Sequence, residues 1–396
     1  VRDSAGIQIV ENRAPLFASN LAWRVDQQPL LTIGDPSGPM AADTMYEFSL
    51  IMGIARMGDG GWAVGLQSAN AIRFFDSGGR FVRSASRYGR GPGEIEQLLR
   101  MYRLPGDTLL VSDIGDAEYF SGDGKWVRLG ASRSQAAGNT IFPMAVFNDQ
   151  SFSGIDVNDA TEREPVDGAR LFPLVVVSRD GLSRQTIGLV PARPFVAGAG
   201  RMPPQIAFSP MPQLASDGKT LYFAYGSHYD ITARATDGRV VRVIRKQHTP
   251  VPVTSSLKSE YAEYRLRVAE GAKGSPLSTT ERASFDQFLD RMQYAEALPA
   301  TGAMLTDRTG NLWVRAYDTR ETITIARIGR GEVRPSTPTP QFASSWDVLD
   351  PRGRWLCTVQ MPARFTALDI GPDYVAGLAR DNDDVEMVRV YRLVKP

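Results

Sequence analysis

The sequence predicts an all-β fold, a six-bladed β-propeller of four-stranded antiparallel blades, on three observations. Glycine (37 residues) and proline (26) are spread along the 396 residues, and short strand-like runs lie between them. Two turn patterns recur along the chain. The last unit is one strand short, and an early segment can complete it. The predicted blades are 48–90, 98–132, 140–190, 206–247, 302–361 and 365–396, the last closed by a strand from 6–34.

The first turn pattern is a polar Gly/Asp/Asn turn that leads into a short apolar run. Its six copies are "GDGGWAVGL" (58–66), "PGDTLLVSD" (105–113), "FNDQSFSGI" (147–155), "SDGKTLYFAY" (216–225), "DRTGNLWVRAY" (307–317) and "IGPDYVAGL" (370–378). Tight turns of this kind need the positive φ angles that Gly, Asn and Asp adopt. Six copies therefore predict six strand pairs of one kind.

The second pattern follows most copies of the first: a turn that ends in Gly, usually then a basic residue, then an apolar alternation. Its five copies lie at 74–83, 119–128, 176–185, 233–243 and 348–357. Each unit is therefore predicted to contain four strands, with a tight turn between the first two and a Gly turn between the last two. Six such meanders indicate a propeller, in which radial repetition leaves only short, protected edges.

The sixth unit lacks the second turn, because the chain ends at Pro396 after about three strands. A closed ring needs a fourth strand, which either "GIQIVEN" (6–12) or "LAWRVDQQPLLTIG" (21–34) can supply. Closure by the N-terminal region removes an open sheet edge. A solenoid with free caps is the competing repeat architecture, but it does not need that early strand.

A helical insertion is predicted at 248–301, between blades 4 and 5. The blades average 66 residues, more than the ~40–50 of common propeller repeats. Ser278 and Glu281 have capping-box spacing. Two apolar stripes have helical spacing: Leu257, Tyr261, Tyr264 and Val268, then Phe285, Phe288, Leu289 and Met292. These stripes either pack on the propeller or meet a protein partner, for which the candidate contacts are Tyr261, Tyr264, Phe285, Phe288 and Met292.

The composition excludes some classes of function. Lys plus Arg number 45 against 44 for Asp plus Glu, so no net field draws the chain to nucleic acid, and no nucleic-acid partner is expected. No apolar run approaches the ~18 residues that cross a bilayer, so no transmembrane segment of its own is expected. The single cysteine, Cys357, excludes an internal disulfide.

The segment "RYGRGPGEIEQ" (87–97) admits three interpretations. A dinucleotide or P-loop cradle is disfavoured, because Pro92 interrupts the run and no GK[ST] follows. A weaker anion or ligand site remains as a second interpretation, with glycine amides, Arg87, Arg90 and Glu94 as its residues. The favoured interpretation is a corner between two blades, in which Glu94 pairs with a nearby arginine.

Neither a catalytic residue nor a metal site is predicted. His228 and His248 are the only histidines, and they lack ligand spacing. No GxSxG nucleophile elbow occurs. No cofactor is expected, and calcium at "DIGD" (113–116) or "DNDD" (381–384) is the alternative, with "DNDD" placed in a hairpin turn.

The segment "GRGPGEI" (89–95), followed by "LPGDTLLVSD" (104–113), resembles bacterial six-bladed β-propeller proteins related to the NHL repeat group. Ile95 stands where that group usually has an aromatic residue, and "DSAGIQIVEN" (3–12) with "LLTIG" (30–34) is similar to its N-terminal region. The resemblance implies an exported protein, often lipid-anchored, without an assigned reaction. No lipid-accepting cysteine stands near Val1.

These observations favour a non-catalytic, periplasmic or otherwise extracytoplasmic binding or scaffold propeller. It would dock a protein partner, as an extrinsic subunit of a membrane complex. The alternative is an enzyme, a lyase or a lactonase or glycoside-type hydrolase, acting at the central channel with or without calcium. Copurification in a larger assembly would distinguish the two hypotheses.

Overall fold

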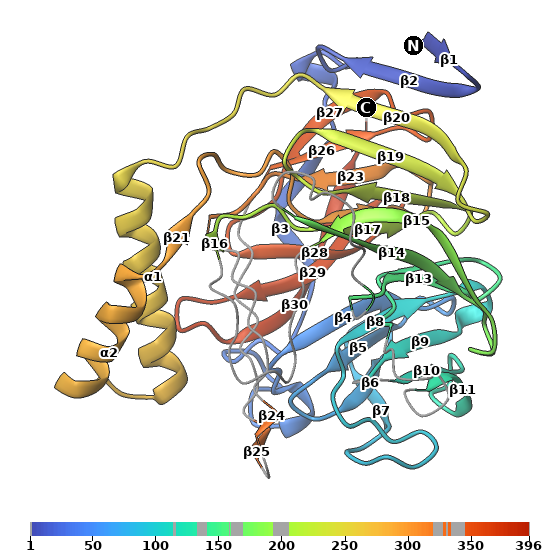
Figure 1. Cartoon of the computed structure of the whole chain (residues 1–396). Coiled ribbons are helices and arrows are strands. Elements are labelled where there is room, and N and C mark those ends of the chain that lie inside the picture. Colours follow the sequence, from blue (N-terminus) through green and yellow to red (C-terminus); the bar gives the residue numbers. More distant parts are fainter. Residues whose placement is uncertain are drawn as a thin grey trace.

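A computed structural model describes residues 2–395 except 114–115, 133–140, 158, 160–168, 193–205, 320–327, 330–331 and 334–344. Its strands form six four-stranded antiparallel blades in a ring (Figure 1). The predicted six-bladed propeller is therefore confirmed.

The first three blades follow the chain without interruption by a strand from elsewhere. Blade 1 contains β4 (Ile51–Arg56), β5 (Trp62–Leu66), β6 (Ala71–Phe75) and β7 (Phe81–Ala85). Blade 2 contains β8 (Arg100–Arg103), β9 (Leu109–Ser112), β10 (Asp116–Phe120) and β11 (Trp126–Ser132). Blade 3 contains β12 (Ala145–Val146), β13 (Phe152–Ile155), β14 (Arg170–Val177) and β15 (Arg184–Ala192).

The last three blades include the insertion and the closure. Blade 4 contains β17 (Gln213–Ser216), β18 (Thr220–Ala224), β19 (Asp230–Ala235) and β20 (Val240–Lys246). Blade 5 contains β22 (Met304–Thr306), β23 (Leu312–Arg315), β26 (Ser345–Leu349) and β27 (Trp355–Gln360). Blade 6 contains β28 (Phe365–Ile370), β29 (Tyr374–Arg380), β30 (Glu386–Val394) and β3 (Arg24–Ile33).

Short elements lie between the blades or extend them. They are β1 (Arg2–Ser4), β2 (Ile7–Asn12), β16 (Ile206–Ala207), β21 (Gln293–Tyr294), β24 (Ile328–Gly329) and β25 (Glu332–Val333). Single 3₁₀ turns form at Ser19–Leu21, Thr44–Tyr46 and Pro105–Asp107.

The N-terminal region closes the ring through one of its two candidate segments. β3 pairs antiparallel with β30 as the fourth strand of blade 6, and the first strand of that blade, β28, packs against β4 of blade 1. β2 instead runs parallel to β20 and widens blade 4. Between them, the amides of Leu16 and Phe17 bond to carbonyls of β27. Residues 2–33 therefore pass along the outer edges of blades 4, 5 and 6.

The predicted helical insertion between blades 4 and 5 is also confirmed. α1 (Ser255–Lys273) and α2 (Thr279–Asp290) form a hairpin that stands outside the blades (Figure 1). Ser278 and Glu281 form the predicted capping box. At the base of the hairpin, β21 pairs with β16. Among the described residues, no helix is long and apolar enough to span a membrane.

The meander order assigns each connection to one of two faces. In blades 1 to 5, the turns between strands one and two and between strands three and four lie on one face. In blade 6 the fourth strand, β3, comes from the N-terminal region and has no such turn. Where the structure describes them, the connections between strands two and three and from blade to blade lie on the other face. We call the second face the insertion face, because it carries the helical hairpin. The segment 87–97 joins blades 1 and 2 and lies on the same face.

Candidate functional site

The predicted anion-site residues at 87–97 pair with carboxylates of their own segment. Arg87 donates to Glu94 Oε1 from Nε at 2.9 Å and from Nη2 at 2.8 Å. The amide of Gly91 donates to Glu94 Oε2 at 2.9 Å, and this bond, followed by that of Arg87, lowers the pKa of Glu94. Arg90 makes two bonds to Glu96, at 3.1 and 2.6 Å, and they raise the pKa of Arg90. Both guanidiniums therefore already hold an anion, although their side chains are 82% exposed.

The same segment is fitted tightly onto blade 2. Asp113 accepts from the amides of Glu96 and Gln97, at 2.8 and 2.6 Å. Gly93 has a φ of +77°, and a Cβ there would lie 2.9 Å from Trp126 Cβ. Close packing and a left-handed backbone both require this glycine. These contacts match the interpretation of the segment as a corner between two blades.

A buried carboxyl lies beneath that corner. Glu118 on β10 is 5% exposed and accepts from the Gly93 amide at 3.2 Å. Burial raises its pKa from 4.5 to about 7, against the opposing effects of bonds from Trp126 and Gly93. Desolvation of a carboxylate disfavours its charged form, so this group takes up a proton near neutral pH.

The predicted partner-binding residues of the insertion divide into two groups. Tyr261 is 8% exposed, and its ring lies 4.8 Å from that of Phe208. Tyr264 and Met292 are half-buried in the same cluster, which holds the hairpin against the propeller. Phe285 and Phe288 on α2 stack on each other with ring centroids 6.1 Å apart, and Phe288 is 47% exposed. α2 itself has no buried residue.

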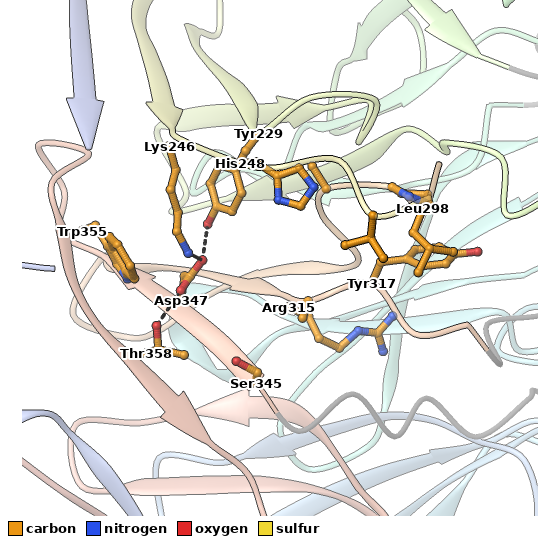
Figure 2. Close-up of a pocket in the computed structure, with 14 residues that line it drawn as sticks. Tyr229, Lys246, His248, Leu298, Arg315, Tyr317, Ser345, Asp347, Trp355 and Thr358 are labelled. Atoms are coloured by element: carbon orange, nitrogen blue, oxygen red, sulfur yellow. Dashed lines mark hydrogen bonds and ion pairs between the residues drawn. The ribbon is translucent and has the colours of Figure 1, made fainter. Parts of the chain in front are cut away.

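A pocket of about 350 Å³ opens where the insertion joins the propeller, between blades 4 and 5. We call it the blade 4–5 pocket (Figure 2). Its polar lining consists of Tyr229, Lys246, His248, Arg315, Tyr317, Ser345, Asp347 and Thr358. Its remaining lining consists of Val251, Leu298, Pro299, Ala300, Ala316 and Trp355. Both ends of the insertion thus contribute to its wall.

Three donors converge on one carboxylate in this pocket, as Figure 2 shows. Asp347 Oδ2 accepts from Lys246 Nζ at 2.6 Å and from the Tyr229 hydroxyl at 2.9 Å, and Oδ1 accepts from the Thr358 hydroxyl at 2.7 Å. Burial, and then the charge of Asp347, raise the pKa of Tyr229 well above its ordinary value. Tyr229 is therefore a neutral donor rather than an acid or base at physiological pH.

Strand alternation explains why these groups meet. On β26, Trp346 and Val348 face the core shared with blade 6, whereas Asp347 between them faces blade 4. On β20, Ile244 and Lys246 share the face toward blade 5, where the backbone of Gly353 approaches closely. A Cβ on Gly353 would lie 2.7 Å from Ile244.

Aromatic rings and a histidine surround the lysine. The ammonium of Lys246 lies 3.8 Å from the Trp355 ring centroid and 5.2 Å from that of Tyr229. Burial lowers the pKa of His248, with smaller contributions from the charges of Lys246 and His228. His248 is therefore mostly neutral at pH 7, since the ordinary pKa of histidine is about 6.5.

The pocket suits binding better than acid–base chemistry. Its carboxylate is occupied by three donors, and its phenol is held protonated. Within the part of the chain that the structure describes, no group of three or more His, Cys, Asp or Glu side chains could hold a metal. Of the acidic clusters, "DNDD" forms the exposed turn between β29 and β30, and positions 114–115 of "DIGD" lie outside the described residues.

Sequence reasoning missed this pocket. Lys246 and Asp347 are 101 residues apart, and neither belongs to a motif. The available signal was the position of Asp347 between Trp346 and Val348, a lone acid in an apolar alternation. The sequence presents His248 only as a histidine without metal-ligand spacing, and nothing in it indicates a place in a pocket.

Comparison with known proteins shows the fold and no family. No family model matches the chain, and no curated protein matches it. Among solved structures, it is similar to a candidate exported protein from Bacteroides fragilis, with a TM-score of 0.50, 11% identity, and coverage of 98% of this chain and 99% of that one. It is also similar to a member of the DUF4221 family from Bacteroides vulgatus, with a TM-score of 0.50, 8% identity, and coverage of 95% and 99%.

A gluconolactonase from Xanthomonas campestris is a more distant match, with a TM-score of 0.43, 12% identity, and coverage of 96% of this chain and 100% of that one. At such identities the similarity defines the class of fold. This chain is a six-bladed β-propeller with a helical insertion.

Proposed function

We propose that this chain is a non-catalytic extracytoplasmic binding propeller that docks a protein partner through the α1–α2 hairpin, as an extrinsic subunit of a membrane complex. The observation that carries the proposal is α2, a helix of 12 residues without a buried residue. Of its aromatic pair, Phe288 is 47% exposed and Phe285 is half-buried. A helix of this length is marginal by itself, and its apolar side gains most by packing on a partner.

The base of the hairpin supports this role, because it holds the helices in a defined position. Phe208, Tyr261 and Tyr294 pack as a cluster of rings, with centroids 4.8–6.4 Å apart. The pairing of β16 with β21 and the bridge between Pro252 and Ala297 add backbone bonds. A preorganised contact surface loses less entropy when it binds. The fold similarity to a candidate exported protein and the resemblance to exported propellers support the extracytoplasmic location.

Affinity purification of the full chain from mildly solubilised native membranes tests the proposal. We expect a larger assembly to copurify, and Phe288→Ser to weaken the association by about tenfold or more, as truncation of an interface aromatic does. Leu182→Ser is the matched control, because Leu182 is 79% exposed in a turn on the opposite face. A monomer that brings no partner, or equal recovery with both variants, would contradict the proposal.

A further inference from the structure

The blade 4–5 pocket has the size and the mixed polar and apolar lining of a small-molecule site. Its volume of about 350 Å³ lies near the lower end of the range for ligand pockets, roughly 300–1,000 Å³. Its lining includes the polar side chains of Lys246, His248, Ser345 and Thr358. It also includes the apolar residues Val251, Leu298, Pro299, Ala300 and Ala316. Such a pocket fits a molecule with one polar end and a compact apolar body.

The polar end offers donors rather than acceptors. Asp347, the acidic residue in the described lining, is already bonded by Lys246, Tyr229 and Thr358. An ammonium has three N–H donors. In the described part of the chain, Asp347 is the acceptor within hydrogen-bond distance of Lys246 Nζ, so two donors remain. The side chain of Lys246 is 21% exposed, so a ligand in the pocket can reach it.

Other cations add little to this end of the pocket. Arg315 is 1% exposed and takes part in further interactions within the protein. His248 is mostly neutral, because burial and the nearby charge of Lys246 lower its pKa. Recognition of an anion therefore rests on the remaining N–H donors of Lys246, since Asp347 already balances its charge.

We propose that the blade 4–5 pocket binds a small organic carboxylate, with the carboxylate on Lys246 and a ring or short carbon body against Val251, Leu298 and Pro299. A charge-assisted bond between an ammonium and a carboxylate is about twice as strong as a neutral one. The imidazole of His248 and the hydroxyl of Ser345 also line the pocket, well apart from each other in Figure 2, and each can bond a polar substituent. This site is separate from the exposed aromatic pair on α2, so it does not depend on partner docking.

His248 provides a direct readout of occupancy. The charges of Lys246 and His228 act on the pKa of His248, and Asp347, Arg315 and Tyr229 line the same pocket. An anion bound at Lys246 favours the imidazolium form, so it should raise the pKa of His248 by about one pH unit. The chain has two histidines, and His248 lines the pocket whereas His228 does not, so the larger change is expected in the His248 signal.

The experiment is a pH titration of the histidine ring signals by NMR, with the full chain and defined probes. Benzoate and D-glucuronate are the carboxylates, one aromatic and one a sugar acid, and benzyl alcohol and D-glucose are their neutral counterparts. We expect at least one carboxylate to raise the pKa of His248 while its neutral counterpart leaves it unchanged. Failure of both carboxylates at millimolar concentration, or equal effects of acid and neutral probe, would overturn the proposal.

Variants locate the effect in the pocket. Lys246→Met should weaken binding of the effective carboxylate by at least about tenfold, because it removes the charged donor. Ala316→Leu fills the pocket from an exposed position and should do the same if Lys246→Met does not fold. Lys219→Met removes one exposed lysine from the opposite face and should bind as the wild type does. Binding retained in both pocket variants would refute the site, and Phe288→Ser should leave binding unchanged even if it abolishes partner association.

Discussion

Two of the connections between neighbouring blades on the insertion face differ in length and in the surface that they leave. Between blades 1 and 2, the short segment 87–97 pairs its own charges and covers Glu118. Between blades 4 and 5, the connection is lengthened into the insertion. Its two ends pair through the bridge between Pro252 and Ala297 and line part of a pocket of about 350 Å³. A short link can fill the gap between two blades with its own side chains and amides. The long connection pairs its two ends with each other instead, and charged groups from the blades line the rest of the pocket.

The largest expected difference between the two junctions concerns their ion pairs. Asp347→Ala should lower the free energy of unfolding by about 2–4 kcal/mol, because it leaves Lys246 and the Tyr229 hydroxyl partly buried without their acceptor. Arg87→Ala at the other junction should cost less than about 0.5 kcal/mol, since 82% of that side chain is exposed. Chemical denaturation of both variants measures the difference, and equal losses would show that the two junctions are stabilised alike.

The second difference is a pH dependence that belongs to the blade 1–2 junction. The pKa of Glu118 rises from 4.5 to about 7 on folding, so the folded chain binds more protons than the unfolded chain between these values. Stability should therefore fall as pH rises from about 4.5 to 7, by about 1–2 kcal/mol once solvent screening is taken into account.

Glu118→Gln should flatten that part of the profile, because the amide does not titrate. Denaturation midpoints between pH 5 and pH 8 measure the slope for both proteins. Glu263→Gln, at an exposed position of α1, is the matched control and should retain the wild-type slope. An unchanged slope in Glu118→Gln would assign the dependence to another group.

The smallest expected effect tests how tightly the corner fits. Gly93→Ala places a Cβ 2.9 Å from Trp126 Cβ at a φ of +77°. Gly106→Ala has nearly the same φ, +75°, with nothing within 4 Å of the new Cβ. Thermal denaturation should show a greater loss for Gly93→Ala, by about 1 kcal/mol, because both variants share the backbone strain of about 1 kcal/mol and one adds the clash. Equal losses would mean that the corner relaxes.

The local features of this chain were predictable because short-range chemistry decides them. The turn at Gly353 needs a positive φ, which is +80° in the structure, and Ser278 with Glu281 caps the helix that follows. Such local signals were enough to predict the number of blades, the helical insertion and the need for an N-terminal closing strand. They could not choose between 6–12 and 21–34, since both segments alternate well enough to be edge strands. That choice follows from the path of residues 13–23 along blade 5.

The sequence by itself determined that this protein is a ring of repeated meanders, because each turn carries its own conformational requirement. Only the tertiary structure decided what its surfaces can do. Arg87 pairs with Glu94 and Arg90 with Glu96, within one short segment. Lys246 instead lies 101 residues before Asp347 and shares one pocket with it and with Trp355. The physical reason is that a pocket forms between blades. The residues that line it depend on which face of each strand lies against the neighbouring blade. A local sequence pattern does not specify that contact between blades.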